Sequence, residues 1–220
     1  MINPSYPDLQ EPLFWKLFER WNSHSLLSPE RLNALYESAK HLVAANIPGA
    51  IVDCGVYRGG GFCLVLEALV QFGDTDRDVY AFDTFQGFPE GIRDVSINGD
   101  VLTRDAWVTG DFQHITAENV AQTGYPMARV HLVRGPVEAT IPVHAPDRIA
   151  HLHLDTDYYE STLHELVHLW PRLSSGGTLI IDDYGHFEGC RRAVDEYFAA
   201  NGPRPLLHRT DYTGRLAMKP

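Results

Sequence analysis

The spacing of hydrophobic positions along this chain changes repeatedly between helical and strand-like periods. Leu32, Leu35, Ala39 and Leu42 recur at helical spacing. The next apolar run, residues 50–53, is short and typical of a buried strand. The same analysis predicts helices at about 12–21, 28–43, 60–72, 116–123, 159–172 and 187–200, and strands at 50–53, 78–82, 129–133, 149–154 and 177–181.

Strands that alternate with helices over this length indicate a doubly wound α/β sheet. Residues 206–218 follow the last helix and have the pattern of a closing hairpin. The sequence therefore predicts a single Rossmann-like domain over residues 49–220, with a seven-stranded, mostly parallel sheet and an antiparallel C-terminal edge hairpin. Residues 1–48 are expected to form an N-terminal helical segment that covers the site.

Two segments are candidates to close over a ligand. Residues 84–115, which include Trp107, lack clean periodicity, and a loop this long inside a compact domain is usually functional or mobile. The aromatic stripe Phe14, Trp15, Phe18 and Trp21 is the second candidate. The alternatives for this stripe are packing on its own domain and contact with a second subunit, in a homo-oligomer formed through the segment.

Composition narrows the classes of partner. The net charge of −11 argues against nucleic acid and anionic membranes, because affinity for both depends on clustered Lys and Arg. There is no apolar run of membrane-spanning length, and Met1–Pro4 does not resemble the start of a signal peptide. We therefore expect a cytoplasmic protein. Cys54, Cys63 and Cys190 form neither a disulfide framework nor a zinc motif, and buried free thiols are expected.

Two of the predicted strands end directly on acidic residues. Asp155 follows strand 149–154, and Asp182 and Asp183 follow strand 177–181. If these strands are neighbours, their ends lie about 5 Å apart, at the edge where open sheets bind ligands. Three carboxylates in one place repel one another unless some are protonated or a cation joins them. A hard cation such as Mg²⁺ or Mn²⁺ suits such a site, and another positive partner is the alternative.

The acids and histidines nearby also have ordinary structural interpretations. One residue of the Asp182–Asp183 pair is suited to capping the following helix, but a cap does not explain the pair together with Asp155. Asp157 is interpreted as the cap of the helix that begins near Tyr159, and therefore as structural.

Three histidines lie near the predicted acid site. His151 and His153 alternate with leucines along one strand, so packed or partner-bonded side chains are expected for both. His186 lies nearer the predicted mouth of the site, where it is a candidate for substrate contact.

A glycine-rich turn joins the first strand to its helix. It contains Gly55, Tyr57, Gly59 and Gly60 in a GxxxGGG pattern, which differs from the GxGxxG fingerprint of dinucleotide proteins. Asp53, just before the turn, would repel a pyrophosphate but suits an amino group. Asp83 ends the next strand and is placed to accept hydrogen bonds from ribose hydroxyls. The combination points to S-adenosylmethionine.

Four segments carry a resemblance to a known family: residues 52–60, 83–89, 155–162 and 181–185. They resemble the macrocin O-methyltransferases, which are class I enzymes that use S-adenosylmethionine and Mg²⁺ to methylate sugar hydroxyls of macrolide and related antibiotics. The resemblance extends from about residue 28 to residue 198. It implies a class I methyltransferase fold.

The resemblance also implies roles for particular residues. Asp155, Asp182 and Asp183 would be the metal ligands, with Asp155 also the catalytic base. The cofactor contacts would come from Asp53, Gly55, Val56, Tyr57, Gly59, Gly60, Asp83 and Gly135. The chain is shorter than the antibiotic-tailoring members, so a macrolide acceptor does not carry over. The expected acceptor is a hydroxyl, on a sugar or vicinal diol, of a natural product or glycan. The rival hypotheses are a metal-dependent hydrolase or phosphatase and a non-catalytic nucleoside-binding module.

Overall fold

The computed structural model describes residues 5–92, 94–103 and 110–220. The α-helices are α1 (Pro12–Trp21), α2 (Pro29–Ala44), α3 (Gly60–Phe72), α4 (Gln113–Gln122), α5 (Val137–His144), α6 (Tyr159–Leu169) and α7 (Glu188–Asn201). The strands are β1 (Ala50–Cys54), β2 (Val79–Asp83), β3 (Asp94–Val95), β4 (Val101–Leu102), β5 (Val130–Arg134), β6 (Ile149–Leu154), β7 (Leu173–Ile181), β8 (His208–Arg209) and β9 (Arg215–Met218).

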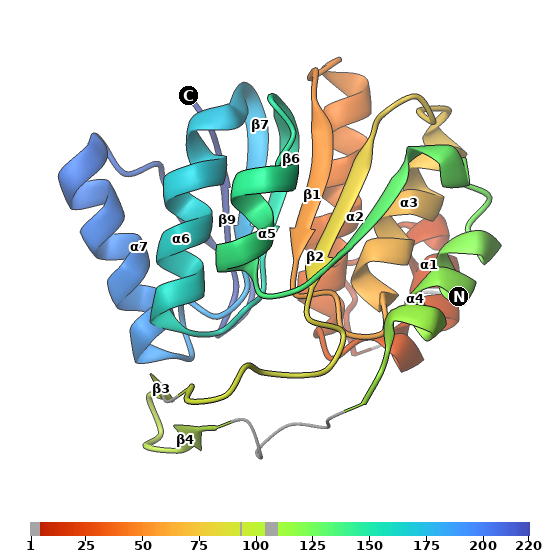
Figure 1. The fold of residues 1–220 in the computed structure, drawn as a ribbon. Coiled ribbons are helices and arrows are strands. Elements are labelled where there is room, and N and C mark those ends of the chain that lie inside the picture. Colours follow the sequence, from red (N-terminus) through yellow and green to blue (C-terminus); the bar gives the residue numbers. More distant parts are fainter. Residues whose placement is uncertain (1–4, 93, 104–109) are drawn as a thin grey trace.

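The main sheet has seven strands in the order β5-β2-β1-β6-β7-β9-β8 (Figure 1). The first five strands in that order are parallel, and β9 and β8 add antiparallel pairs at one edge. The predicted sheet and its edge hairpin are therefore confirmed. The chain builds outward from β1 in one direction and then returns to place β6 on the other side of β1. Ligands of open α/β sheets bind at such a switch point.

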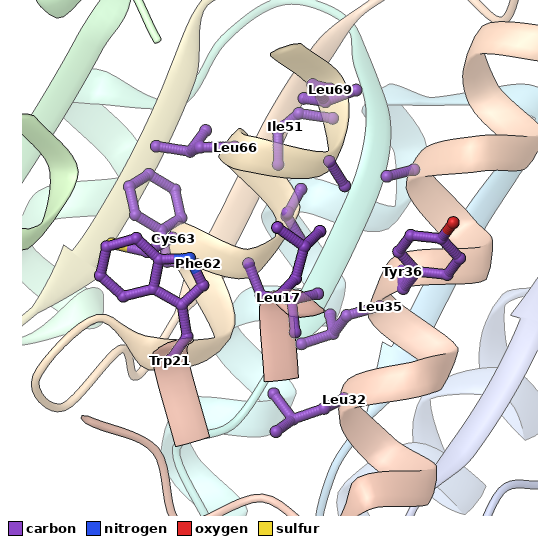
Figure 2. Packing of buried hydrophobic residues seen from close by; sticks show 14 of the residues in the cluster. Leu17, Trp21, Leu32, Leu35, Tyr36, Ile51, Phe62, Cys63, Leu66 and Leu69 are labelled. Carbon is purple, nitrogen blue, oxygen red and sulfur yellow. The ribbon is translucent and has the colours of Figure 1, made fainter. Parts of the chain in front are cut away.

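The two faces of the sheet carry separate hydrophobic cores. Helices α1, α2 and α3 pack on one face, and Leu17, Trp21, Leu35 and Phe62 belong to that core (Figure 2). Helices α5, α6 and α7 cover the other face, and they bury the leucines of β6 beneath them. Because α1 and α2 share a core with β1 and α3, the N-terminal segment is part of the folding unit.

The aromatic stripe of the N-terminal segment is packed within its own chain. Phe14, Trp15 and Trp21 are at most 3% exposed, and Phe14 contacts Tyr36 of α2 with ring centroids 5.7 Å apart. Phe18 is partly buried against the same core. The stripe therefore uses its apolar surface for the monomer core, as one of the sequence alternatives proposed.

Helix α5 and strands β3 and β4 were not anticipated by periodicity. Helix α5 has eight residues and contains Pro142, which lacks the backbone N–H that an ordinary helix interior uses. Strands β3 and β4, of two residues each, pair in antiparallel fashion inside the segment predicted as an irregular loop. Trp107 of that segment lies outside the described residues.

The three cysteines are buried and free, as expected. None of the helices in the described ranges is long and apolar enough to cross a membrane.

Candidate active site

One row of backbone hydrogen bonds crosses the carboxyl ends of the five parallel strands. The amides of Asp182, Asp155, Gly55 and Gly135 each donate to a carbonyl group in the last two residues of the neighbouring strand, at 2.9 Å in every case. The parallel register thus sets these four positions level with one another. This is why residues far apart in the sequence form a single site.

A cavity of about 460 Å³ lies above this row. Such a volume suits a small-molecule ligand. Part of its lining is made by residues predicted to contact the cofactor, which we call the cofactor side: Asp53, Gly55, Val56, Tyr57, Asp83 and Gly135. The residues that follow or face the acid-ended strands form the acid side: His153, Asp155, Asp157, Asp182, Asp183 and His186. The structure therefore brings together nearly all of the site residues predicted from the sequence.

Gly59 and Gly60 are the exceptions, since neither lines this cavity. Gly59 is the N-cap of α3 with φ of +82°, a left-handed conformation that favours glycine. A side chain at Gly60 would collide with the backbone of His24. In this structure both glycines shape the turn and its packing.

Asp83 is held by backbone donors. One of its carboxylate oxygens accepts from the amides of Val56 and Tyr57 at 2.7 and 2.9 Å, and the other accepts from Phe85 at 2.7 Å. Burial raises the pKa of Asp83, and these backbone hydrogen bonds oppose that rise. The carboxylate thereby ties the glycine turn to the end of β2.

The histidines of β6 lie on the face opposite the leucines and are partner-bonded, as predicted. His151 is bonded to Thr178 at 2.8 Å, and burial lowers the pKa of His151 to about 3. His153 is bonded to Asp53 at 2.8 Å, and its other ring nitrogen lies 3.8 Å from Asp182. Burial alone would lower the pKa of His153, but Asp53 and Asp182 raise it well above the ordinary value. His153 therefore links the cofactor side to the acid side.

Strands β6 and β7 are neighbours, so the acids that follow them converge. Asp155, Asp157 and Asp183 can each offer one oxygen to a common ion, and so can Asp155 and Asp182 together with His153, with the donor atoms of each set within 4.8 Å. Burial raises the pKa values of Asp155 and Asp183 well above the ordinary value, and the neighbouring aspartates raise them further. The cluster is therefore electrostatically strained, as the sequence predicted.

Two carboxylate oxygens of this cluster are buried without a hydrogen-bond partner among the described residues. They are Oδ1 of Asp182, which lies 3.8 Å from Nε2 of His153 without a hydrogen bond, and Oδ2 of Asp183. Orphaned buried acceptors are rare in folded proteins and call for an explanation, such as a bound ion. Asp182 and Asp183 each belong to a different set of possible ligands that includes Asp155, and carboxylate oxygens of this kind suit a hard cation.

The interpretation of Asp157 as a helix cap is wrong. The N-cap of α6 is Tyr158, which makes no side-chain capping bond, and Asp157 adopts a left-handed φ of +73°. That turn brings the carboxyl group of Asp157 to the acid cluster, where one of its oxygens lies within 4.8 Å of oxygens of Asp155 and Asp183. The alternative that Asp182 or Asp183 caps α7 does not hold either, because Phe187 is its N-cap.

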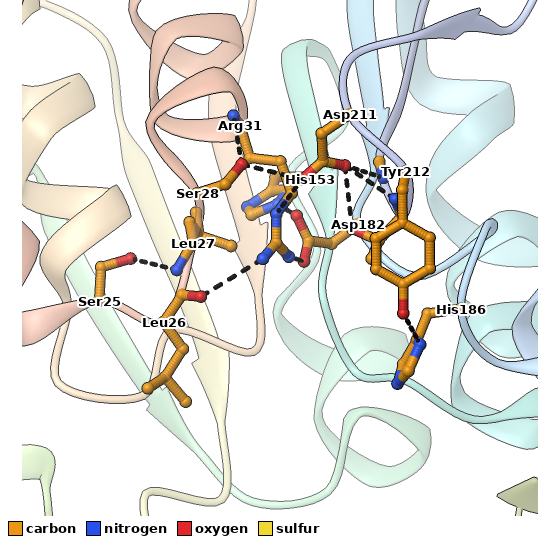
Figure 3. A network of polar contacts seen from close by, with 12 residues as sticks. Ser25, Leu26, Leu27, Ser28, Arg31, His153, Asp182, His186, Asp211 and Tyr212 are labelled. Carbon is orange, nitrogen blue, oxygen red and sulfur yellow. Dashed lines mark hydrogen bonds and ion pairs between the residues drawn. The ribbon is translucent and has the colours of Figure 1, made fainter. Parts of the chain in front are cut away.

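A positive partner for the acids is Arg31, which sequence reasoning did not single out. Its guanidinium forms a close ion pair with Asp182 and a second ion pair with Asp211 at 3.2 Å (Figure 3). Arg31 is the third residue after the N-cap Ser28, in the first turn of α2. A cation there opposes the helix dipole, and this mismatch is the signal that the sequence offered.

His186 lines the cavity and is half-buried. Its imidazole is hydrogen-bonded to the hydroxyl of Tyr212, and the two rings meet edge to face at 5.6 Å (Figure 3). Tyr212 belongs to the turn between β8 and β9 and is 45% exposed. The edge hairpin therefore contributes a wall of the site in addition to closing the sheet.

Comparison with known proteins places the chain in a family. A model of the macrocin O-methyltransferase (TylF) family matches residues 20–218. The demethyldecarbamoylnovobiocin O-methyltransferase of Streptomyces niveus is 32% identical over 81% of this chain and 69% of its own length. The mycinamicin III 3''-O-methyltransferase of Micromonospora griseorubida is 31% identical over 87% of this chain and 77% of its own length.

Solved structures agree with these matches. The structure of the O-methyltransferase NovP superposes with a TM-score of 0.78 at 30% identity, covering 89% of this chain and 82% of that one. The calicheamicin methyltransferase CalS11 has a TM-score of 0.71 at 19% identity over 99% of this chain and 94% of that one, which shows the shared fold. The chain belongs to the macrocin O-methyltransferase family and is an S-adenosylmethionine-dependent O-methyltransferase.

Proposed function

We propose that the chain methylates a hydroxyl of a sugar or vicinal diol, carried by a natural product or glycan, in a reaction that depends on Mg²⁺ or Mn²⁺. The observation that carries the metal part is the pair of orphaned oxygens on Asp182 and Asp183, buried beside Asp155. The acceptor class is supported by a relative from Streptomyces olivaceus, 32% identical, whose name specifies 4'-O-methylation of a rhamnosyl tetracenomycin.

The cofactor side is suited to S-adenosylmethionine. Gly55 has φ of +85°, and a side chain there would collide with the carbonyl of Asp155, so the backbone turns closely beneath the cavity. Asp53 supplies a carboxylate for the amino group of the methionine moiety. Asp83 fixes the turn that would hold the nucleoside.

The acid side would activate the acceptor. Asp155, Asp182 and Asp183 would hold the divalent ion, which when bound acts as a Lewis acid that lowers the pKa of the acceptor hydroxyl. Asp155 would take the hydroxyl proton as the general base, because it lines the cavity beside the proposed ion site. The acceptor oxygen bonds to the methyl carbon as the carbon–sulfonium bond breaks, which yields a methyl ether and S-adenosylhomocysteine. The chain's contribution to the rate is then alignment and exclusion of water.

Calorimetric titration with S-adenosylhomocysteine, with and without Mg²⁺, tests the two halves of the proposal separately. We expect the wild type and Asp182→Asn to bind S-adenosylhomocysteine alike, and only the wild type to transfer labelled methyl groups to glycoside acceptors. Turnover that persists unchanged in EDTA would remove the metal requirement. Failure to bind S-adenosylhomocysteine would overturn the cofactor assignment and favour the hydrolase alternative. Binding without any turnover would support a non-catalytic module.

A further inference from the structure

Arg31 reaches the acid cluster from outside the sheet. Its side chain is 16% exposed and enters from the first turn of α2. The guanidinium pairs with Oδ2 of Asp182 and donates to the carbonyl of Leu26 at 3.3 Å (Figure 3). The charge of Arg31 therefore lies within the site proposed for the metal.

Asp211 gives Arg31 a second anchor that is itself fixed. The amides of Thr213 and Gly214 donate to Oδ1 of Asp211 at 2.8 and 2.7 Å. Its other oxygen accepts from the hydroxyl of Ser28 at 2.8 Å and lies 3.2 Å from Nε of Arg31. Arg31 can release Asp182 and still remain paired with a carboxylate.

We infer that Arg31 is an internal counter-ion that competes with the divalent ion for Asp182 and so sets the affinity of the site for metal. The inference rests on the metal site of the proposed function. The guanidinium and a divalent ion would both be drawn to the carboxylate of Asp182, and two cations at one carboxylate repel each other. In the metal-free protein Arg31 offsets repulsion among the acids, and in the loaded protein it pairs with Asp211 alone.

Competition between Arg31 and the metal ion for Asp182 would also affect the wall of the cavity. Ser25, Leu26, Leu27 and Arg31 all line the cavity. Because Arg31 donates to the Leu26 carbonyl, transfer of Arg31 from Asp182 to Asp211 changes the support of this wall. This part of the N-terminal segment reaches the site, whereas the aromatic stripe of α1 does not line it.

The test is a Mn²⁺ titration of the metal-free full chain, followed by the electron paramagnetic resonance of the free ion. We expect Arg31→Gln to bind Mn²⁺ about tenfold more tightly than the wild type, since it removes a charged hydrogen-bond competitor. Arg31→Lys keeps the charge and should stay within about threefold of the wild type. Arg192→Gln is the matched control, because it removes the same charge from an exposed pair with Glu196 and should change nothing.

A second variant tests the same competition in the opposite direction and does not require Arg31→Gln to fold. Asp211→Asn removes the alternative anchor, so Arg31 should hold Asp182 more firmly and Mn²⁺ should bind more weakly. This effect should vanish in the double variant with Arg31→Gln. Binding of S-adenosylhomocysteine checks that each variant is folded.

The outcomes separate this inference from the proposed function. Equal Mn²⁺ affinity in the wild type, Arg31→Gln and Asp211→Asn overturns the competition but leaves a metal-dependent enzyme. Absence of Mn²⁺ binding in all variants that bind S-adenosylhomocysteine overturns the metal site together with the inference, and leaves methyl transfer standing.

Discussion

Carboxylates lie at or near the carboxyl ends of strands on both sides of the switch point, but their hydrogen bonds are satisfied in opposite ways. On the cofactor side, Asp83 accepts three backbone amides and Asp53 is bonded to His153. On the acid side, Asp182 and Asp183 each keep a buried oxygen with no hydrogen-bond partner in the described part of the chain. The same residue type at equivalent strand ends therefore fixes a loop on one side and is left available to a ligand on the other.

This comparison separates stability from function. A carboxylate whose hydrogen bonds are met within the chain contributes to folding, and its loss leaves buried donors unpaired. A carboxylate that is repelled by its neighbours costs stability and persists because it serves activity. Identical Asp→Asn substitutions on the two sides should then have opposite consequences.

The largest effect is expected for Asp183→Asn. Its carboxyl group has a pKa raised by burial and by Asp157 and Asp182, so removing its charge should leave the free energy of unfolding unchanged or slightly higher. Methyl transfer should fall by about 10³-fold or more, because a group that supports charge stabilisation is lost. Urea denaturation and initial rates with a glycoside acceptor measure both. A marked loss of stability would contradict the proposed division of roles.

The matched substitution on the other side, Asp83→Asn, should mainly affect folding. An amide group cannot accept from the amides of Val56, Tyr57 and Phe85 as the carboxylate does, and its own NH₂ would face donors. We expect the free energy of unfolding to fall by about 2–4 kcal/mol and the affinity for S-adenosylhomocysteine to weaken as the glycine turn loosens. Calorimetry and urea denaturation check this, and wild-type stability in the variant would mean that Asp83 is not the anchor of the turn.

The sequence predicted the strand ends well because apolar runs and the residues that follow them are local signals. Asp155 and Asp182 could be placed together once β6 and β7 were taken as neighbours, and the structure pairs them in parallel. The partners of these acids could not be predicted in the same way. Arg31 precedes Asp182 by 151 positions, and the pairing depends on how α2 packs across the sheet.

The position of Asp157 in the acid cluster was not predicted, for a different reason. A residue before a helix is usually a cap, but its backbone here adopts a left-handed turn that points the side chain inward. Helix α5 escaped detection because Pro142 interrupts the pattern of a segment only eight residues long. In both places local propensity was overruled by tertiary packing.

The raised pKa values on the acid side predict that the stability of the metal-free protein falls as the pH rises. Asp155, Asp157 and Asp183 have pKa values raised above the ordinary 3.8, so the folded state holds protons that the unfolded chain releases, and stability falls as the pH rises above about 4. The raised pKa of His153 acts in the same direction, because its stabilising contribution is complete below pH 6.5 and is lost as the pH rises through the folded value. Burial and the neighbouring acids cause the shifts of the three carboxyl groups.

We therefore expect the free energy of unfolding of the metal-free chain to be lower at pH 8.5 than at pH 6. Saturating Mg²⁺ should flatten this slope, because it stabilises the ionised carboxylates. Urea denaturation at both pH values, with EDTA or Mg²⁺, measures the difference. A slope that Mg²⁺ leaves untouched would indicate that the titrating acids do not bind the ion.

The smallest expected effect is that of Asp157→Asn, which defines the border of the acid side. An asparagine tolerates the left-handed φ of +73° at this position and has nearly the same size and shape as the aspartate. If Asp155, Asp182 and Asp183 hold the ion and Asp157 only neighbours them, Mn²⁺ affinity should fall by no more than about fivefold, the effect of one nearby charge. Stability should rise slightly, since the removed charge lay beside like charges.

The described acids also permit a set of ligands made of Asp155, Asp157 and Asp183. In that case Asp157→Asn would weaken Mn²⁺ binding as much as Asp183→Asn. Titrating the two variants side by side decides which carboxylates the acid side uses.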